Sequence, residues 1–418
     1  MYHTRVCEQL IERTAASFPC IVGYGPRQAG KSTTIHHLFK DFCPMITLDD
    51  RSDRDLALTD PHRFLEAYGW PLVIDEIQKA PQLLDEIKKQ IDAQRLKWMD
   101  EGKPQKLMYI LTGSNRFPLE QGITDSLAGR CGIVEMASFS LCETLGLPSS
   151  PFTPDIATLL KKEREISIPY QNTQDIFKQI FHGGMPDIAT GTSQRDIYFT
   201  SYVDTYIEQD VRTLLNASNE TAFRNFLEIV ALRTAQELHY EEIAVQTGID
   251  VRTCKQWLSI LVASGIIYLL RPFMANLSNR VIKAPKLYFM DTGLCAYLCK
   301  WPNAEMLGKG VMNGAFFETF VVSEIVKNLR AFGKEVDSTL FYYRDKDQKE
   351  IDLLYLTENG LYPIEIKEGL YPKKATRNFS VLSKYPQPVQ TGLVMNPCEK
   401  MRPLGELAWL YPVYRIGT

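Results

Sequence analysis

Short apolar runs alternate with amphipathic stretches over the first third of the chain. Residues 31–39 and 83–100 have apolar positions at helical spacing, and the second stretch carries Lys and Glu on its polar side. Four apolar runs have the length of buried strands: 20–24, 45–48, 72–74 and 106–111. Strands that alternate with helices predict a parallel sheet with crossover helices. We therefore expect an α/β domain over residues 1–150.

The pattern changes after a segment rich in Pro and Ser at residues 146–154, which predicts a domain boundary. Residues 195–214 predict a long helix, and residues 222–264 predict three shorter ones. From about residue 308 the pattern predicts a helix at 315–329, followed by three strands at 339–344, 350–356 and 361–366. The interpretation is a helical middle domain over 151–305 and an α/β domain over 306–418.

A glycine-rich segment lies between the first predicted strand and the helix that follows it. It has two glycines that bracket four residues, and then Lys-Ser, which is the P-loop pattern. Glycines let backbone N–H groups point at phosphate oxygens, and the start of the next helix adds positive charge. Lys31 is predicted to reach the β- and γ-phosphates of ATP, and Ser32 to bind Mg²⁺. The predicted nucleotide-binding residues are Gly25, Pro26, Arg27, Gln28, Ala29, Gly30, Lys31, Ser32 and Thr33.

Two acids end the apolar run at 72–74, where a P-loop site needs them. Asp75 is predicted to hold Mg²⁺ and Glu76 to act as the base toward the attacking water. The alternative is that both acids only cap the next helix. A further apolar run, 106–111, leads into Thr-Gly-Ser-Asn, where Ser114 or Asn115 is placed to orient the water.

Residues 20–142 resemble the ATPase domain of a widespread prokaryotic family of AAA-type ATP-binding proteins. The resemblance implies a Mg²⁺-dependent ATPase with a polar sensor at Asn115. It also implies that Arg130, in the segment Ser126-Leu127-Ala128-Gly129-Arg130, is an arginine finger that reaches a neighbouring subunit. The other interpretation of Arg130 is a surface arginine that closes a helix. The same resemblance extends through residues 182–186, 202–212 and 286–293.

The middle domain has the pattern of a winged helix. Residues 240–250 predict a helix and a glycine turn, a second helix follows through Arg252, Thr253 and Lys255, and apolar runs at 266–272 and 286–289 predict a wing. Two roles remain open. The second helix reads DNA in the major groove, or the module is a lid or protein-docking element of the ATPase.

Four charged residues of the last domain occur in the order of the PD-(D/E)XK nuclease fold, which this region resembles. They are Glu318 on the predicted helix, Asp352 at the start of one strand, and Glu365 and Lys367 at the end of the next. Such a set holds Mg²⁺ and positions a hydroxide for phosphodiester cleavage. The alternative is that these are ordinary charged residues at strand ends, on a nuclease-like fold that does not cleave.

Composition restricts the partners. The 418 residues carry a formal net charge of −3, so a basic field over the whole chain is absent. Nine cysteines without paired spacing, no apolar run that spans a membrane and no signal peptide favour a cytoplasmic protein. Two hypotheses follow. One is an ATP-driven enzyme that acts on DNA or RNA. The other is a nucleotide-controlled switch that docks a protein partner or forms homo-oligomers.

Overall fold

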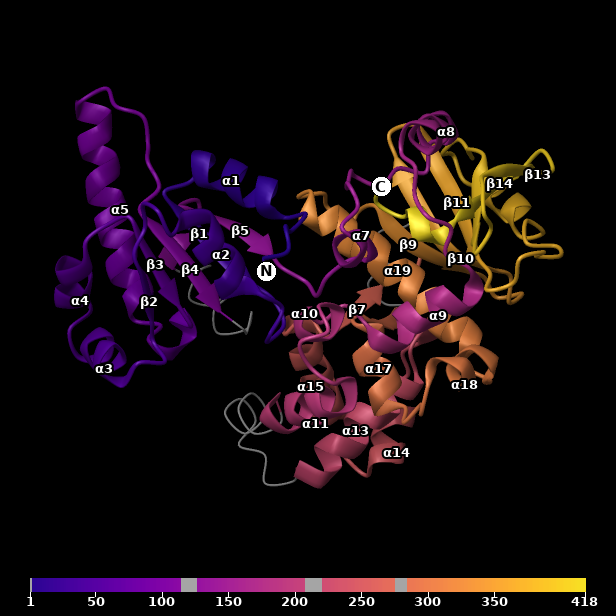
Figure 1. Ribbon diagram of the computed structural model, residues 1–418, viewed down its shortest axis with the longest axis horizontal. Helices are drawn as coiled ribbons and strands as arrows, with labels where there is room; N and C mark the ends of the chain where they lie inside the picture. Colours follow the sequence, from indigo (N-terminus) through magenta and orange to yellow (C-terminus); the bar gives the residue numbers. More distant parts are fainter. Residues whose placement is uncertain (1, 114–125, 207–219, 275–283) are drawn as a thin grey trace. The chain divides into compact units, whose positions relative to one another are not determined.

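The computed structural model describes residues 2–113, 126–206, 220–274 and 284–418 (Figure 1). These residues form two compact units. The N-terminal unit contains Met1–Ser138 with two short additions, Ala263–Gly265 and Ala331–Gly333. The C-terminal unit contains Phe139–Val262, Ile266–Arg330 and Lys334–Thr418. The predicted middle and last domains thus share one compact unit, and the boundary between them stays a prediction.

The N-terminal unit is built on a five-stranded parallel sheet with the order β2-β3-β4-β1-β5. Its strands are β1 Cys20–Tyr24, β2 Met45–Thr47, β3 Leu72–Asp75, β4 Tyr109–Gly113 and β5 Cys131–Glu135. Its helices are α1 Glu8–Ser17, α2 Lys31–Phe39, α3 Arg51–Thr59, α4 Pro61–Tyr68 and α5 Leu83–Asp100, with a 3-10 turn η1 at Ile77–Lys79. The strand β4 lies between β1 and β3, and this order decides which side chains meet at the sheet edge.

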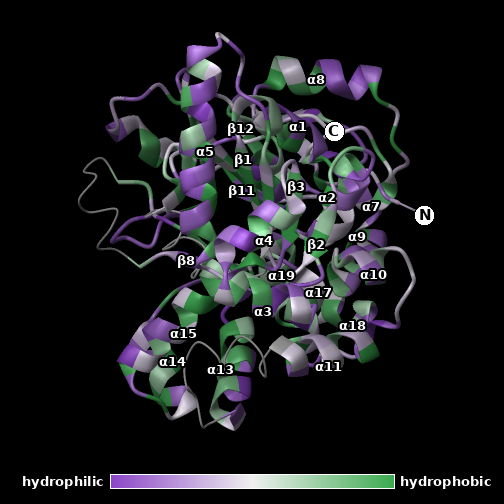
Figure 2. Ribbon diagram, turned by 90° about the vertical axis from the view of Figure 1, so that its left-hand side faces the viewer, coloured by the Kyte–Doolittle hydropathy of each residue, from purple (hydrophilic) through white to green (hydrophobic). Residues whose placement is uncertain are grey.

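Successive residues of the central strands bury opposite faces of the sheet. Ile21, Val73 and Ile110 pack with residues of α1 and α2 on one face. Their neighbours pack with residues of α4 and α5 on the other face. Such apolar runs without polar alternation are typical of parallel strands that are covered on both sides. The long helix α5 alternates hydrophilic and hydrophobic positions along its length (Figure 2), as the sequence predicts.

The C-terminal unit contains a six-stranded mixed sheet with the order β13-β14-β12-β11-β10-β9. Its strands are β9 Leu340–Arg344, β10 Glu350–Thr357, β11 Gly360–Ile366, β12 Gly392–Asn396, β13 Arg402–Leu404 and β14 Ala408–Pro412. A smaller sheet has the order β6-β8-β7, with β6 Gln236–Glu237, β7 Ile267–Leu270 and β8 Lys286–Phe289. The α-helices of this unit are α7 Leu141–Leu145, α8 Ile156–Glu165, α9 Thr173–His182, α10 Pro186–Ala189, α11 Arg195–Tyr206, α13 Glu220–Leu232, α14 Tyr240–Thr247, α15 Val251–Ala263, α17 Thr292–Leu298, α18 Ala304–Lys309 and α19 Asn313–Ala331, and its 3-10 turns are η4 Phe379–Lys384 and η5 Val413–Arg415.

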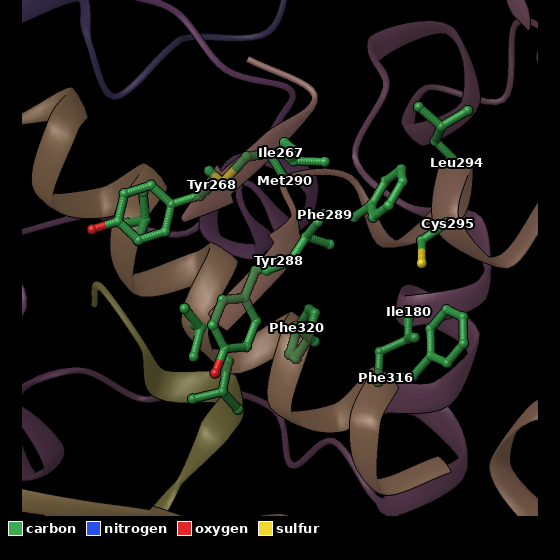
Figure 3. Packing of buried hydrophobic residues seen from close by; sticks show 14 of the residues in the cluster. Ile180, Ile267, Tyr268, Tyr288, Phe289, Met290, Leu294, Cys295, Phe316 and Phe320 are labelled. Carbon is green, nitrogen blue, oxygen red and sulfur yellow. The ribbon is translucent and has the colours of Figure 1, made fainter. Parts of the chain in front are cut away.

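One apolar cluster runs through the C-terminal unit and joins α19, β8 and the larger sheet. Figure 3 shows part of it, where Tyr288 and Phe289 of β8 point in different directions and Phe316 and Phe320 come from α19. The helix α19 is buried along nearly its whole length, including charged residues such as Glu324 and Lys327. Because the smaller sheet and the larger sheet share this core, charged side chains of β8 can meet those of β10.

The strands and helices that the sequence predicts are confirmed, with ends shifted by up to three residues. The exception is the predicted helix 195–214, which is described only as far as Tyr206. Several short elements were not predicted, among them α3, α4 and the strands β12 to β14. Of the helices in the described parts of the chain, none combines the length and the apolar character needed to cross a bilayer.

Candidate functional site

The loop between β1 and α2 needs glycine at both of its motif positions. Gly25 has a φ of 155°, and a Cβ there would lie 1.9 Å from the carbonyl oxygen of Met136. Gly30 precedes α2 with a φ of 85°, in the left-handed region that glycine adopts without strain. The chain therefore curls between Tyr24 and Lys31 as a P-loop does.

The buried Lys31 side chain folds over this loop. Its ammonium donates hydrogen bonds to the carbonyl oxygens of Gly25 at 3.0 Å and Pro26 at 2.7 Å. A second cation supports the loop from the N-terminal segment. The guanidinium of Arg5 donates to the carbonyl oxygens of Ala29 at 2.8 Å and Ala137 at 2.7 Å. No sequence motif points to Arg5, which lies 24 residues before Ala29.

Ser32 and Asp75 meet at the edge of the sheet, where the parallel strands end. The Ser32 hydroxyl donates to Asp75 Oδ1 over 2.9 Å. The Thr112 hydroxyl donates to the same oxygen of Asp75. Thr112 is close enough to do so because β4 lies next to β3. Hydroxyl and carboxylate oxygens are the ligand types that Mg²⁺ prefers. The pair Ser32 and Asp75 therefore fits a Mg²⁺ ion, and Thr112 is a site residue that the sequence analysis did not single out.

Glu76 follows Asp75 in an unusual backbone conformation. Its φ is 58°, in the left-handed region, and the chain enters the turn η1 immediately after it. Glu76 makes no side-chain capping hydrogen bond to this turn, whereas Gln78 donates from its amide to Glu76 Oε2. Asp75 and Glu76 thus both accept hydrogen bonds from side chains, Asp75 from Ser32 and Glu76 from Gln78.

The other residues predicted for this site are Ser114, Asn115 and Arg130. Ser114 and Asn115 lie outside the described residues. Arg130 forms a bidentate pair with Asp92 of α5, in which Nε and Nη2 donate over 2.6 Å and 2.8 Å. This hydrogen bonding lowers the pKa of the Asp92 carboxyl. An arginine finger would have to leave Asp92, so the role of Arg130 in a neighbouring subunit stays a prediction.

The second candidate site lies on the larger sheet of the C-terminal unit. The strands β10 and β11 pair antiparallel, with Leu353 opposite Ile364. This register places Asp352 beside Glu365, and Lys367 Nζ lies 3.2 Å from Asp352 Oδ2 and 2.8 Å from Glu365 Oε1. Burial and the neighbouring Asp352 raise the pKa of Glu365 to about 8. Three of the four residues predicted for the nuclease-like site are therefore in one group.

The fourth residue, Glu318 on α19, is bound by the smaller sheet instead. Its Oε1 accepts from Lys286 Nζ at 2.9 Å and from the Tyr288 hydroxyl at 2.6 Å. Lys286 Nζ also lies 2.5 Å from Glu350 Oε1. In the described part of the chain, no three His, Cys, Asp or Glu side chains converge on a point that holds a metal ion. Lys286 contacts Glu318 and Glu350, and Lys367 contacts Asp352 and Glu365. The charges of Glu318 and Asp352 also act on each other.

The three residues predicted to read DNA lie on α15 and its first turn. Thr253 is engaged at the start of the helix, where its backbone N–H and its hydroxyl bond the Asp250 carboxylate at 2.9 Å and 2.6 Å. Lys255 Nζ lies 5.2 Å from the centre of the Tyr240 ring. Arg252 is exposed. The helix thus presents a mixed surface rather than a row of basic groups.

Comparison with known proteins identifies the first unit. Residues 17–145 match the family described as AAA domain, whereas 173–305 and 313–416 match two domains of unknown function, DUF8612 and DUF4143. Uncharacterized proteins of Mycobacterium tuberculosis and Mycobacterium bovis are each 25% identical over 380 residues, which are 88% of this chain and 76% of theirs. The chain thus contains an AAA-type ATP-binding domain.

Two solved structures show a weaker likeness. The Walker-type ATPase of Pyrococcus abyssi has a TM-score of 0.43 and 14% identity, and the match covers 71% of this chain and 96% of that one. The ADP complex of Hsp104 from S. cerevisiae has a TM-score of 0.25 and 12% identity, and the match covers 78% of this chain and 43% of that one.

Proposed function

We propose that this protein hydrolyses ATP to ADP and phosphate with Mg²⁺. The observation that carries the proposal is the hydrogen bond of 2.9 Å from Ser32 Oγ to Asp75 Oδ1. It lies next to the P-loop lysine, Lys31, which binds the carbonyl oxygens of its own loop. Bound Mg²⁺ would neutralise charge on the phosphate oxygens. Ser32 and Asp75 are the residues that would hold it.

The remaining residues of the loop bind and orient the triphosphate. Lys31 exchanges the carbonyl oxygens of Gly25 and Pro26 for the β- and γ-phosphate oxygens, which are stronger acceptors for an ammonium. Glu76 takes the proton of the attacking water, and the Gln78 amide holds the Glu76 carboxylate in place. Thr112 fixes the Asp75 carboxylate from β4. In this proposal Asn115 orients the water.

A phosphate-release assay tests the proposal. The purified protein should release phosphate from ATP in the presence of Mg²⁺, and excess EDTA should reduce the rate to background. Because the sequence predicts a metal ligand at Ser32, the Ser32→Ala variant should require a higher Mg²⁺ concentration for half-maximal rate. Release that is unaffected by EDTA would contradict the metal-dependent mechanism. The same assay with added DNA shows whether nucleic acid stimulates turnover.

A second candidate function is cleavage of nucleic acid by the C-terminal unit, as in nucleases of the PD-(D/E)XK type. The supporting observation is that Lys367 joins Asp352 and Glu365 across paired strands. Glu365 Oε2 is buried and has no hydrogen-bond partner among the described residues. An unpaired buried carboxylate oxygen is costly, and a divalent cation would satisfy it. In this proposal α14, α15 and the smaller sheet form a winged helix that holds the DNA.

The Lys367→Ala substitution tests this second candidate. Cleavage of DNA or RNA in Mg²⁺ or Mn²⁺ should fall by roughly 100-fold, because the ammonium no longer positions the reacting groups. Lys373→Ala is a matched control, since Lys373 is an exposed lysine of the same unit. Equal activity of the wild type and Lys367→Ala would rule out a nuclease at this site.

The alternative to a nucleic-acid enzyme is a switch that uses its nucleotide state to dock a protein partner or to form homo-oligomers. The mixed surface of α15 favours it, because Thr253 already serves as a partner of Asp250. A change of oligomer size between ATP and ADP, together with turnover that is indifferent to DNA, would select this alternative. Salt-sensitive DNA binding would select the first.

A further inference from the structure

A lysine from the smaller sheet lies within the acidic region of the larger one. Lys286 begins β8, and its side chain is only 4% exposed. Its ammonium is 2.9 Å from Glu318 Oε1 on α19 and 2.5 Å from Glu350 Oε1 on β10. A positive group therefore bridges two carboxylates from separate elements, which is the position that a bound cation would occupy.

The surroundings hold this ammonium in one place. Tyr288 lies two residues further along β8, so its side chain leaves the strand on the same side as that of Lys286. The Tyr288 hydroxyl donates over 2.6 Å to the same oxygen of Glu318. On the outer side, Arg344 Nε lies 3.8 Å from Glu350 Oε2. Glu318 and Glu350 thus receive their positive partners from within the protein.

The nearby pair of acids also has a lysine partner, but that lysine is more exposed to solvent than Lys286. Asp352 and Glu365 share Lys367, whose side chain is 36% exposed, and Glu365 Oε2 remains without a partner among the described residues. We call Glu318 and Glu350, with the buried Lys286, the closed half of the acidic region. The other half consists of Asp352 and Glu365 with the partly exposed Lys367. The predicted nuclease-like set of four residues crosses this division, because Glu318 belongs to the closed half.

We infer that the Lys286 ammonium is the built-in cation of the Glu318–Glu350 pair and that it keeps a divalent cation out of this half of the acidic region. Because β8 pairs with β6 and β7, this charge is supplied by the segment proposed to be a winged helix. The inference deepens the second candidate function, since it concerns the same acidic region. It rests on the metal-binding part of that proposal and does not require strand cleavage.

Counting bound Mn²⁺ per chain tests the inference. Free Mn²⁺ is measured by electron paramagnetic resonance in nucleotide-free protein, so that any ion at the P-loop contributes equally to every variant. Lys286→Ala should bind one more Mn²⁺ than the wild type, because it removes the ammonium and leaves room for an ion and its water. Lys286→Arg should keep the wild-type count, because its guanidinium retains a positive charge beside the two carboxylates.

A double variant shows whether the added ion uses the proposed pair. Lys286→Ala with Glu318→Gln should return to the wild-type count, because one of the two carboxylates is gone. Equal counts for the wild type and folded Lys286→Ala would overturn the inference. So would an added ion that persists in the double variant.

A measurement on the wild type covers the case in which Lys286→Ala does not fold. Acetic anhydride modifies accessible lysines, and peptide mass spectrometry reports each site. Lys286 should stay unmodified with and without saturating Mn²⁺, while the exposed Lys373 is modified in both. Modification of Lys286 only in Mn²⁺ would overturn the inference, because the metal would then displace the ammonium.

A different variant tests the metal position of the second candidate function. Glu365→Gln should lower the Mn²⁺ count of the wild type by one if Asp352 and Glu365 hold an ion. An unchanged count would remove the proposed nuclease-like metal position. The comparison between the wild type and Lys286→Ala does not involve Glu365, so the two failures are distinguishable.

Discussion

Lys31→Ala is expected to abolish tight ATP binding. The P-loop motif directs the ammonium of Lys31 at the β- and γ-phosphates. A charge-assisted hydrogen bond contributes about 1.5–3 kcal/mol, and two of them account for a loss of roughly 100-fold or more in affinity. Turnover should fall with binding, because the triphosphate is no longer held in position for attack.

Titration with a fluorescent ATP analogue measures this loss. Lys40→Ala is a matched control, because Lys40 is an exposed lysine at the end of the same helix. Since Lys31 also bonds Gly25 and Pro26 within its own loop, thermal unfolding of the variant should be recorded in parallel. Wild-type turnover in a folded Lys31→Ala protein would remove the ATP site from this position.

Glu76→Gln is expected to leave ATP binding intact and to stop hydrolysis. The amide has nearly the same shape as the carboxylate, but it does not accept a proton from water. Loss of a general base lowers a rate by roughly 10²- to 10⁴-fold. Gln78, which donates to Glu76 in the wild type, keeps an acceptor in the variant because the new amide also carries an oxygen.

Single-turnover experiments separate the two effects. The variant should retain bound ATP over a time in which the wild type converts it to ADP. Glu66→Gln is the control, because Glu66 is an exposed glutamate of α4 in the same unit. If Glu76→Gln hydrolyses ATP at the wild-type rate, another group is the base, and Asp75 would be the next candidate.

The N-terminal unit was readable from sequence because its signals are local. The P-loop spacing, the apolar strands and the two acids at the end of β3 each occupy fewer than ten consecutive residues. Thr112 and Arg5 carry no such signal. Thr112 reaches Asp75 only because β4 inserts between β1 and β3, which strand order decides and chain order does not. Residues that act through tertiary neighbours are therefore the ones that pattern analysis omits.

In the C-terminal unit, too, the sequence pattern predicts the strands but not the contacts between separate sheets. Strand-like runs predict β9, β10 and β11, and the antiparallel pairing of β10 with β11 places Asp352 beside Glu365. The position of Glu318 was not predictable, because its partner Lys286 comes from another sheet and lies 32 residues earlier. The sequence pattern predicts a wing strand over 286–289, and the family resemblance extends through 286–293, but neither indicates a contact between Lys286 and Glu318.

The bend between β10 and β11 limits which changes of length the acidic pair can tolerate. Thr357 pairs with Gly360, so only two residues form the bend, and Gly360 has a φ of 126°. Side chains along a strand alternate between the two faces of a sheet. If gain or loss of one residue at the bend shifted the pairing of β10 and β11 by one residue, Asp352 and Glu365 would face opposite sides of the sheet while every charged side chain remained in the sequence. In related chains, a length change at this bend would thus reveal loss of the acidic pair that residue identity alone conceals.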